Sequence, residues 1–282
     1  MSDATPKDAP AAPRRSLRRS RGAAVLVATA STLLVFGAVI WAIVNSPGWP
    51  VVQERFFDAE AFMIALPKVF AGLLVNIGIF LIAEVFILIW ALVLAAMRGL
   101  QDPVFFPLRL FAIVYIDLFR GLPSILIVFV LGLGIPALGL PGVSNSVYVW
   151  GIVSLVLVWS AYVAEVYRAG IDSVHPSQAA AARSLGLSGF QTFRYVVLPQ
   201  AIRRVIPPLL NDLIGLQKDT ALVSFLGPVE AFKRAQILAS GSFNFTPYFA
   251  SALLFLALTI PLARFVDWLI ARDRKRYLAG AR

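Results

Sequence analysis

Cysteine is absent from this chain of 282 residues, and histidine occurs once, as His175. The lack of cysteine excludes disulfide bonds, thiolate nucleophiles and cysteine-ligated metals, and one histidine cannot build a zinc site alone. Charge is also scarce, because only 14% of the residues are Asp, Glu, Lys or Arg, whereas soluble domains carry about 25%. With 59% hydrophobic residues, the chain is too apolar to face water on every side, and lipid is its expected solvent.

Long apolar runs are what the chain has instead. The run from Gly22 to Val44 contains no charge, and a helix of this length, at about 1.5 Å per residue, covers the roughly 30 Å hydrocarbon core of a bilayer. It exceeds the core of a signal peptide, about 7–15 residues, so we expect a retained transmembrane helix over 22–45. Further candidate spans lie at about 70–97, 110–135, 147–166, 205–227 and 248–271. Strand-like alternation is missing, and the sequence therefore predicts an all-α, polytopic membrane protein with about six transmembrane helices.

The net charge of +10 is spread unevenly. Arginine is concentrated in the tail 1–21, near Arg98 and Arg109, in the central loop 167–204 and in the tail 272–282. The positive-inside rule places these segments, and so both termini, in the cytoplasm. Anchoring to anionic headgroups explains arginines that flank spans more simply than nucleic-acid binding does. The polar tail 1–21 is expected to be disordered.

One segment of the central loop looks soluble. Pro176 suits a first helical turn, the alanines that follow are strong helix formers, and Gly186 stands where a left-handed residue would end the helix. The pattern predicts a short helix of about two turns. Two interpretations stay open at this point, an amphipathic helix resting on the bilayer or the chain's own span ends, and a docking surface for another protein.

The spacing of this segment resembles the coupling loop of permease subunits of ATP-binding-cassette importers. The family signature is Glu-Ala-Ala, three residues, Gly, nine residues, Ile-x-Leu-Pro, and here Ala180-Ala181-Ala182, Gly186 and Val196-Val197-Leu198-Pro199 stand at that spacing. The segments "YIDLFRGLPSILIVF" (115–129), "AYVAEVYRAGIDSVHPSQ" (161–178) and "LPQAIRRVIPPLLNDLIGLQKDTALVSFLG" (198–227) resemble the polar amino-acid branch of the family. The resemblance extends over about 70–270.

The resemblance implies a fold, a function and partners. It implies the type I importer fold, with a permease core over 66–271, and a transport subunit rather than an enzyme. Two permease subunits, identical or homologous, would pair, an extracytoplasmic binding protein would deliver a polar amino acid, and a cytoplasmic ATPase dimer would hold ATP and Mg. No G-x-x-x-x-G-K-[ST] loop occurs in this chain, so ATP must be handled by another chain, and no cofactor is expected here.

The coupling contact is implied for a set of residues in this loop. They are Gln178, Ala180, Ala181, Ala182, Arg183, Gly186, Leu198 and Pro199. The chain departs from the family at Ala180, which replaces the signature Glu, and at Ala221, where the family usually has Ser. Many family members have five spans, so the helix over 22–45 is an addition.

Polar residues inside the predicted spans are candidates for the translocation path, because a charge at the bilayer centre costs about 2.5–3.5 kcal/mol on insertion scales. At 100° per residue Asn211, Gly215 and Lys218 share one face of span 205–227, with Asp219 and Thr220 near it. Glu84 lies alone in span 70–97. The alternatives are a path-facing wall that meets the carboxylate or ammonium of the substrate, and structural ion pairs of Lys218 with Glu84 or Asp219.

The break "DLFRGLPS" in span 110–135 predicts a gate or hinge at Arg120, Gly121 and Pro123, since proline lacks an amide donor and clashes with the preceding turn. Asp117 and Arg120 are spaced for an i, i+3 pair, as are Glu165 and Arg168. The competing functions are a self-sufficient secondary carrier, which would need its own ion site, and an intramembrane hydrolase, for which no Ser has an evident base.

Overall fold

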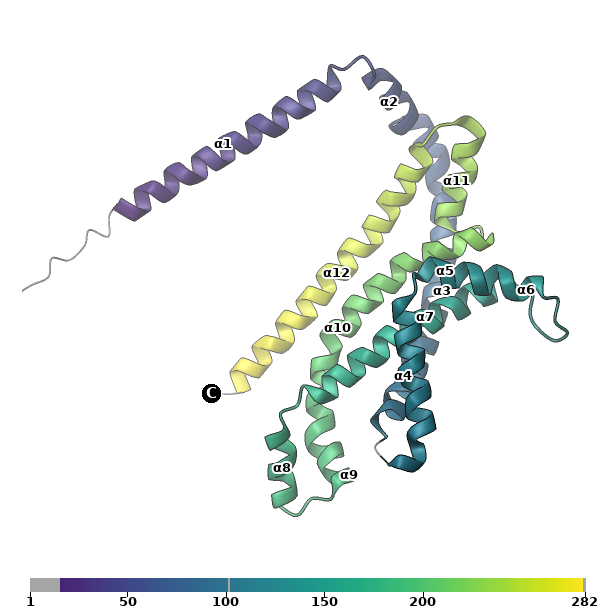
Figure 1. Ribbon diagram of the computed structural model, residues 1–282. Helices are drawn as coiled ribbons and strands as arrows, with labels where there is room; N and C mark the ends of the chain where they lie inside the picture. Colours follow the sequence, from purple (N-terminus) through teal and green to yellow (C-terminus); the bar gives the residue numbers. More distant parts are fainter. Residues whose placement is uncertain (1–15, 101, 281–282) are drawn as a thin grey trace, which may run out of the picture. The chain divides into compact units, whose positions relative to one another are not determined.

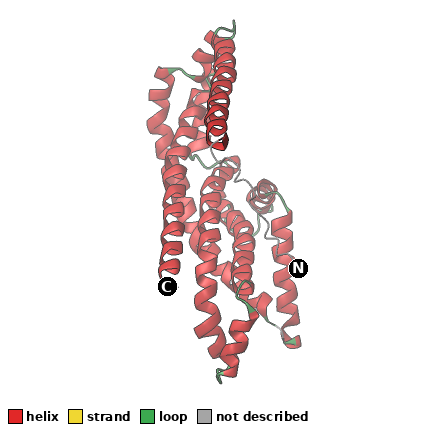
Figure 2. Cartoon of the chain, turned by 90° about the vertical axis from the view of Figure 1, so that its left-hand side faces the viewer, coloured by secondary structure: helices red, strands yellow, loops and turns green. Residues whose placement is uncertain are grey.

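The structure is a computed structural model that describes residues 16–100 and 102–280, with side chains from 22 to 272 in these ranges. It divides into two units, Met1–Glu54 and Arg55–Arg282, each held by its own internal contacts. Every regular element in the described ranges is a helix (Figure 2). The all-α prediction is therefore confirmed.

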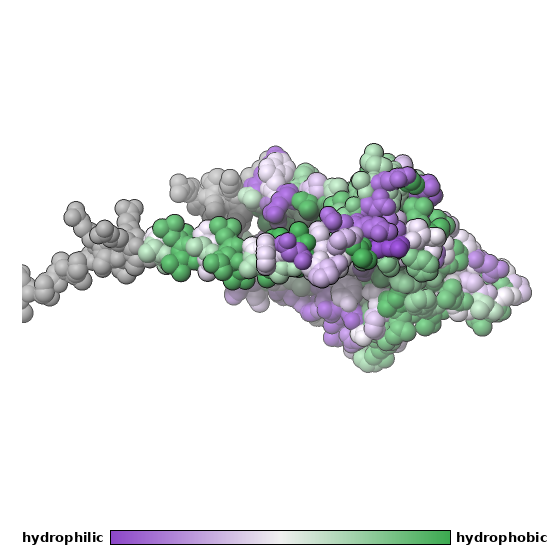
Figure 3. All heavy atoms as spheres, turned by 90° about the horizontal axis from the view of Figure 1, so that it is seen from above, coloured by the Kyte–Doolittle hydropathy of each residue, from purple (hydrophilic) through white to green (hydrophobic). Residues whose placement is uncertain are grey.

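The first unit contains helix α1 (Ser16–Val44) and most of helix α2 (Trp49–Phe56). The α1 helix includes the predicted span 22–44, in which no residue is buried. The visible side of this span is mainly hydrophobic (Figure 3), and residues 22–44 include no charged side chain. Such a helix requires lipid or an apolar partner around it. Residues 1–15 of the basic tail lie outside the described residues.

In the second unit, the 41-residue helix α3 (Ala59–Gly99) packs against α4, α7, α10, α11 and α12 (Figure 1). Asp58 caps its first turn, accepting hydrogen bonds from the backbone N–H groups of Glu60 at 2.9 Å and Ala61 at 3.1 Å. This satisfies donors that a helix start leaves without partners.

The next span is bent. The turn η1 (Pro103–Phe105) leads into α4 (Phe106–Gly121), and α5 (Ser124–Phe129) continues through the π-helical turn η2 (Val130–Gly134) into α6 (Ile135–Ala137). The two halves meet at 105°. Because Pro123 stands directly before α5 and cannot donate a backbone hydrogen bond, the predicted interruption at "DLFRGLPS" is confirmed.

Helix α7 (Val147–Asp172) packs against α3, α4 and α10 and forms the centre of the core. Leu155 of α7 is fully buried together with Ile87 of α3 and Ile116 of α4. Small residues, such as Gly151, let neighbouring helices approach closely, which is how helices associate in lipid.

The remaining elements complete the unit. They are α8 (Pro176–Ser184), α9 (Gly189–Thr192), the π-helical turn η3 (Phe193–Val197), α10 (Leu198–Asp219), the 3-10 segment η4 (Thr220–Leu226), α11 (Ala231–Ser242) and α12 (Thr246–Gly280). Helices α8 and α9 lie at the end of the unit toward which α12 runs (Figure 1). We call this the α8 end, and the opposite end, where α11 meets the start of α12, the α11 end.

The predicted spans compare with the structure as follows. Four helices in the described residues are long and apolar enough to cross a membrane, and the bent pair can form one more. These helices include five of the predicted spans, at 22–44, 70–97, 110–135, 147–166 and 248–271. The prediction at 205–227 needs correction, because α10 begins at Leu198, ends at Asp219 and is not among these apolar helices. Its amide and charged groups lower its hydropathy.

Candidate functional site

The predicted coupling helix forms as α8, and the local sequence caps both of its ends. The ring of His175 accepts a hydrogen bond from the backbone N–H of Ser177 at 3.2 Å, as expected for a helix-start residue. Pro176 occupies the first turn, where no amide donor is needed. Gly186 follows with a φ of 84°, a left-handed conformation that glycine adopts without strain.

Most residues predicted to contact an ATPase lie on the surface of this segment. Exposed members are Gln178, Ala180, Ala181, Arg183, Gly186 and Pro199, whereas Leu198 is half-buried. Ala182 is only 6% exposed, so its methyl group packs against the chain itself. Three large side chains of the same segment are also exposed: Leu185 by 82%, Phe190 by 71% and Tyr195 by 65%. Exposed apolar side chains grouped on a polar segment indicate a contact surface.

Charged groups join the ends of the helices that flank this segment. Arg168 pairs with Glu165 on α7, which confirms that predicted pair. Glu165 also accepts a hydrogen bond from Arg98 of α3 at 2.9 Å, so one carboxylate holds the ends of two helices. The Arg204 guanidinium of α10 donates to the carbonyl oxygen of Ser173, which follows α7. We call residues 176–199 the coupling segment, and the α8 end of the unit is thus braced on both sides of it.

The predicted polar face of α10 is divided between two neighbours. Asn211 and Lys218 are exposed. Gly215 instead faces α7, where a Cβ atom would collide with the ring of Trp159. The same indole donates a hydrogen bond from its Nε1 to Asp219 Oδ2 at 3.3 Å. The aromatic ring therefore fixes the carboxylate at the end of α10 through a contact that only glycine permits.

Lys218 borders a cavity of about 540 Å³ on the other side of α10. Its walls come from η4, α11 and α12 and include Ala221, Phe232, Ser251 and Thr259. Most of this lining is apolar, and Lys218 contributes the one charged side chain among the residues that line it. Thr220, predicted with this set, is fully buried and does not face the cavity.

Glu84 has a different neighbour from the one predicted. The charge that acts on it comes from Asp212 of α10, and the Glu84 charge in turn acts on Tyr167 of α7. No ion pair of the described side chains includes Glu84 or Lys218. The described structure therefore shows no direct pair between Glu84 and Lys218, and the Lys218 charge acts on the Asp219 carboxylate instead. One oxygen of Asp212 is buried without a hydrogen-bond partner.

The predicted gate residues occupy the bend between α4 and α5. Gly121 ends α4, and Pro123 precedes α5. The predicted pair of Arg120 with Asp117 does not form in the described structure. The Arg120 guanidinium lies over the Tyr162 ring of α7 instead, 5.6 Å from its centroid. An aromatic face within about 6 Å attracts a cation and explains the difference.

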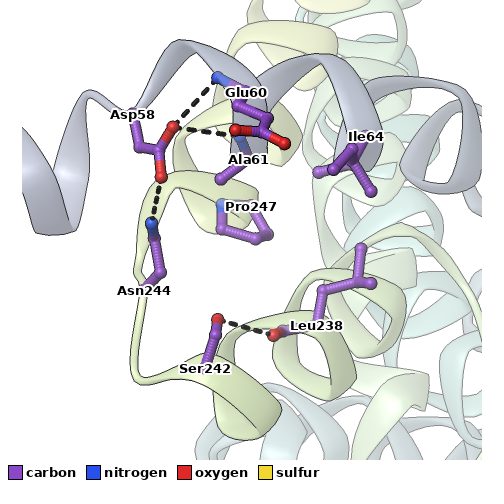
Figure 4. Close-up of a pocket in the computed structure, with 9 residues that line it drawn as sticks. Asp58, Glu60, Ala61, Ile64, Leu238, Ser242, Asn244 and Pro247 are labelled. Carbon is purple, nitrogen blue, oxygen red and sulfur yellow. Dashed lines mark hydrogen bonds between the residues drawn. The ribbon is translucent and has the colours of Figure 1, made fainter.

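Polar bonds at the α11 end join elements that are distant in sequence. Asp58 accepts a hydrogen bond from the Asn244 side chain at 2.9 Å, beside a cavity of about 270 Å³ that Ile64, Leu238 and Pro247 help to line (Figure 4). These contacts fix the start of α3 to the loop before α12.

Sequence reasoning missed several buried polar residues. Asn76, Gln217 and Glu230 are at most 3% exposed, and Trp159 holds Asp219. Asn76 had a signal, since it interrupts the apolar run of span 70–97. Glu230 had none, because its partners come from the fold. Among the described residues there is no cluster of His, Cys, Asp or Glu that could hold a metal ion.

Comparison with known proteins gives the family. Residues 91–275 match the model of the binding-protein-dependent transport system inner membrane component. The chain is 36% identical to the "Probable amino-acid permease protein YxeN" of Bacillus subtilis over 72% of its own length and 90% of that protein. It is also 36% identical to the "Probable glutamine ABC transporter permease protein GlnM" of the same species, covering 70% of this chain and 91% of the relative.

A solved structure agrees with this match. The crystal structure of an amino acid ABC transporter with histidines superposes with a TM-score of 0.71 at 30% identity, over 76% of this chain and 98% of that one. A self-sufficient secondary carrier does not fit these relatives. The bent span, the exposed coupling segment and these matches lead to one conclusion: the chain belongs to the family of inner-membrane components of binding-protein-dependent transport systems.

Proposed function

We propose that this chain is the permease subunit of an importer that moves a polar amino acid across the cell membrane, with both termini in the cytoplasm. The relatives named as amino-acid and glutamine permeases support the substrate class. The arginines of the central loop and of the C-terminal tail support the orientation.

One observation carries the mechanism: α10 connects the coupling segment to the polar residues without a break. Its 22 residues extend over about 33 Å at 1.5 Å per residue. The helix starts at Leu198 and Pro199, within the coupling signature, and ends at Lys218 and Asp219. A displacement of α8 and α9 would therefore move the residues that line the path.

The partner at the coupling segment would be a cytoplasmic ATPase dimer, which holds and hydrolyses ATP with Mg. Leu185, Phe190 and Tyr195 supply the apolar contact, and the small side chains of Ala180 and Ala181 allow a groove to approach closely. The missing signature carboxylate at position 180 leaves Arg183 and Gln178 among the exposed polar groups of this surface, together with Gln191 and Arg194.

The path itself offers complementary charges to an amino acid. The Lys218 ammonium is suited to the substrate carboxylate, and the Asp219 carboxylate to the substrate ammonium. A second permease subunit, identical or homologous, would close the path opposite Asn211 and Lys218, both of which are exposed in the single chain. An extracytoplasmic binding protein would deliver the substrate at the α11 end.

The test is reconstitution. The chain is purified from its native membrane with any ATPase and permease subunits that accompany it, placed in liposomes with the binding protein, and supplied with labelled glutamine, glutamate, histidine or arginine. We expect uptake of at least one of them that requires ATP and the binding protein. Uptake by the lone chain driven by an ion gradient would contradict the proposal.

A further inference from the structure

Asn76 is a polar residue in the middle of the apolar helix α3, and it is 1% exposed. Its amide nitrogen donates a hydrogen bond to the Thr220 hydroxyl at 3.1 Å. Its amide oxygen accepts one from the backbone N–H of Ala231, also at 3.1 Å. Thr220 directly follows α10 and Ala231 begins α11. One side chain thus holds both ends of the segment that connects these helices.

The two bonds belong to a network that is largely buried. The Thr220 hydroxyl in turn donates to the carbonyl oxygen of Gln217, at 2.8 Å, in the last turn of α10. Glu230, 0% exposed, caps α11 by accepting from the N–H groups of Phe232 and Lys233 at 3.0 and 2.7 Å. Because a buried polar group without a partner costs about 1–3 kcal/mol, each member depends on the others remaining in place.

Glycines on three elements receive the same connecting segment. A Cβ atom on Gly72 of α3 would lie 2.6 Å from the backbone of Ala231. A Cβ on Gly132 of η2 would collide with Leu226, and one on Gly151 of α7 with Val223. Such close approach fixes where residues 220–231 can lie.

We infer that Asn76 is a positioning residue for transport, because it couples the end of α10 to α11. When movement of the coupling segment displaces α10, residues 220–231 at the α11 end then move with it. The inference rests on the proposed function. Within the described part of the chain Asn76 is the side chain that bonds both the cap of α10 and the first residue of α11. The apolar contacts of Val223 and Leu226 seat the connecting segment, and the Asn76 hydrogen bonds add a direct polar link between its two ends.

A role in coupling and a role in stability predict different measurements. If Asn76 only stabilises the fold, its loss lowers ATP hydrolysis and uptake together, because fewer complexes are active. If it transmits motion, the surviving complexes hydrolyse ATP without moving substrate. The ratio of uptake to ATP hydrolysed separates the two, since it does not depend on the amount of active complex.

The experiment uses the full complex in liposomes and the labelled amino acid that the wild type takes up. We expect Asn76→Leu to lower uptake per ATP by about fivefold or more, the lower range of coupling between sites. Ser224→Ala is the matched control, because this hydroxyl lies in the same segment, is 2% exposed and has no hydrogen-bond partner. The ratio of uptake to ATP hydrolysed in Ser224→Ala should equal that of the wild type.

Thr220 supplies a second pair of variants in case Asn76→Leu does not assemble. Thr220→Val removes the hydroxyl at nearly constant volume and should lower the ratio, whereas Thr220→Ser keeps the hydroxyl and should preserve it. An unchanged ratio in every variant that assembles, Thr220→Val included, would overturn the inference while leaving the proposed function intact. A wild-type complex without ATP-dependent uptake would refute the proposed function itself.

Discussion

At the scale of single residues, candidate path and gate residues contact aromatic rings that sequence spacing does not reveal. Helical periodicity groups Gly215 with Asn211 and Lys218 as one polar face. The structure instead sets Gly215 against Trp159, which holds Asp219. In the same way Arg120 contacts Tyr162 rather than the predicted Asp117. In both cases the partner lies on α7 and could not be found from i, i+3 spacing along one helix.

The contact between Gly215 and Trp159 predicts a strong effect from one methyl group. Gly215→Ala places a Cβ against the indole, and overpacking of this kind costs about 1–3 kcal/mol. We expect a lower denaturation temperature and slower uptake, because the ring must move away from Asp219. Gly78→Ala on α3 is the control, since nothing lies within 4 Å of its Cβ position. Equal behaviour of the two variants would contradict the assignment.

Glu165 should contribute more to stability than an ordinary surface carboxylate, because it pairs with Arg98 and Arg168 and its side chain is 21% exposed. We expect Glu165→Gln to lower the free energy of unfolding by about 1–2 kcal/mol, between the values for exposed pairs and for charged hydrogen bonds in the interior. Asp267→Asn breaks the Arg264 pair, whose side chains are 80% and 66% exposed, and should cost less.

Thermal denaturation in detergent measures both variants. A second measurement at about 1 M salt should narrow the difference between wild type and Glu165→Gln, since screening weakens the pairs that the variant has lost. A larger loss of stability in Asp267→Asn than in Glu165→Gln would show that the pairs of Glu165 with Arg98 and Arg168 do not stabilise the α8 end.

At the scale of elements, the coupling segment has exposed residues that can contact a partner and a buried residue that packs against the rest of the chain. Ala181 is exposed, and its neighbour Ala182 is buried. Ala181→Arg should abolish association with the ATPase while insertion into the membrane stays normal. Ala182→Arg should disturb the segment itself and increase its cleavage by protease. Co-purification and limited proteolysis check the two outcomes, and normal coupled uptake by Ala181→Arg would refute the docking surface.

How far the sequence predicts each element depends on where its stabilising partners lie. Helix α8 was predictable in detail because His175, Pro176 and Gly186 act within the segment. Uniformly apolar spans such as 22–44 and 147–166 were predictable because lipid imposes one requirement on them. Helix α10 was less predictable, since its start at Leu198 directly continues the turn η3 and its end at Asp219 is held by contacts with α7 and α3. Asn76 itself is visible in the sequence, but its partners are 144 and 155 residues away.

At the scale of the whole molecule, the family match and the first unit occupy different parts of the chain. The family match covers residues 91–275, and the second unit begins at Arg55. Nothing within the span 22–44 is buried, and its side chains carry no charge. The features assigned to transport, from Asn76 to the coupling segment, all belong to the second unit. The first unit therefore has no part in the proposed mechanism.

Removal of the first span should therefore leave transport intact. Residues 1–45 are deleted and replaced by an unrelated signal anchor of the same orientation, so that Trp49 and α2 still follow a membrane helix. We expect ATP-dependent uptake per assembled complex within about twofold of the wild type, because no residue of the path or coupling segment is altered. A tenfold loss would instead correspond to about 1.4 kcal/mol. An anchor scrambled in sequence but equal in length and hydropathy serves as the control for lipid-specific effects. Complexes that assemble in normal amounts but no longer transport would show that α1 contributes to the cycle through its sequence.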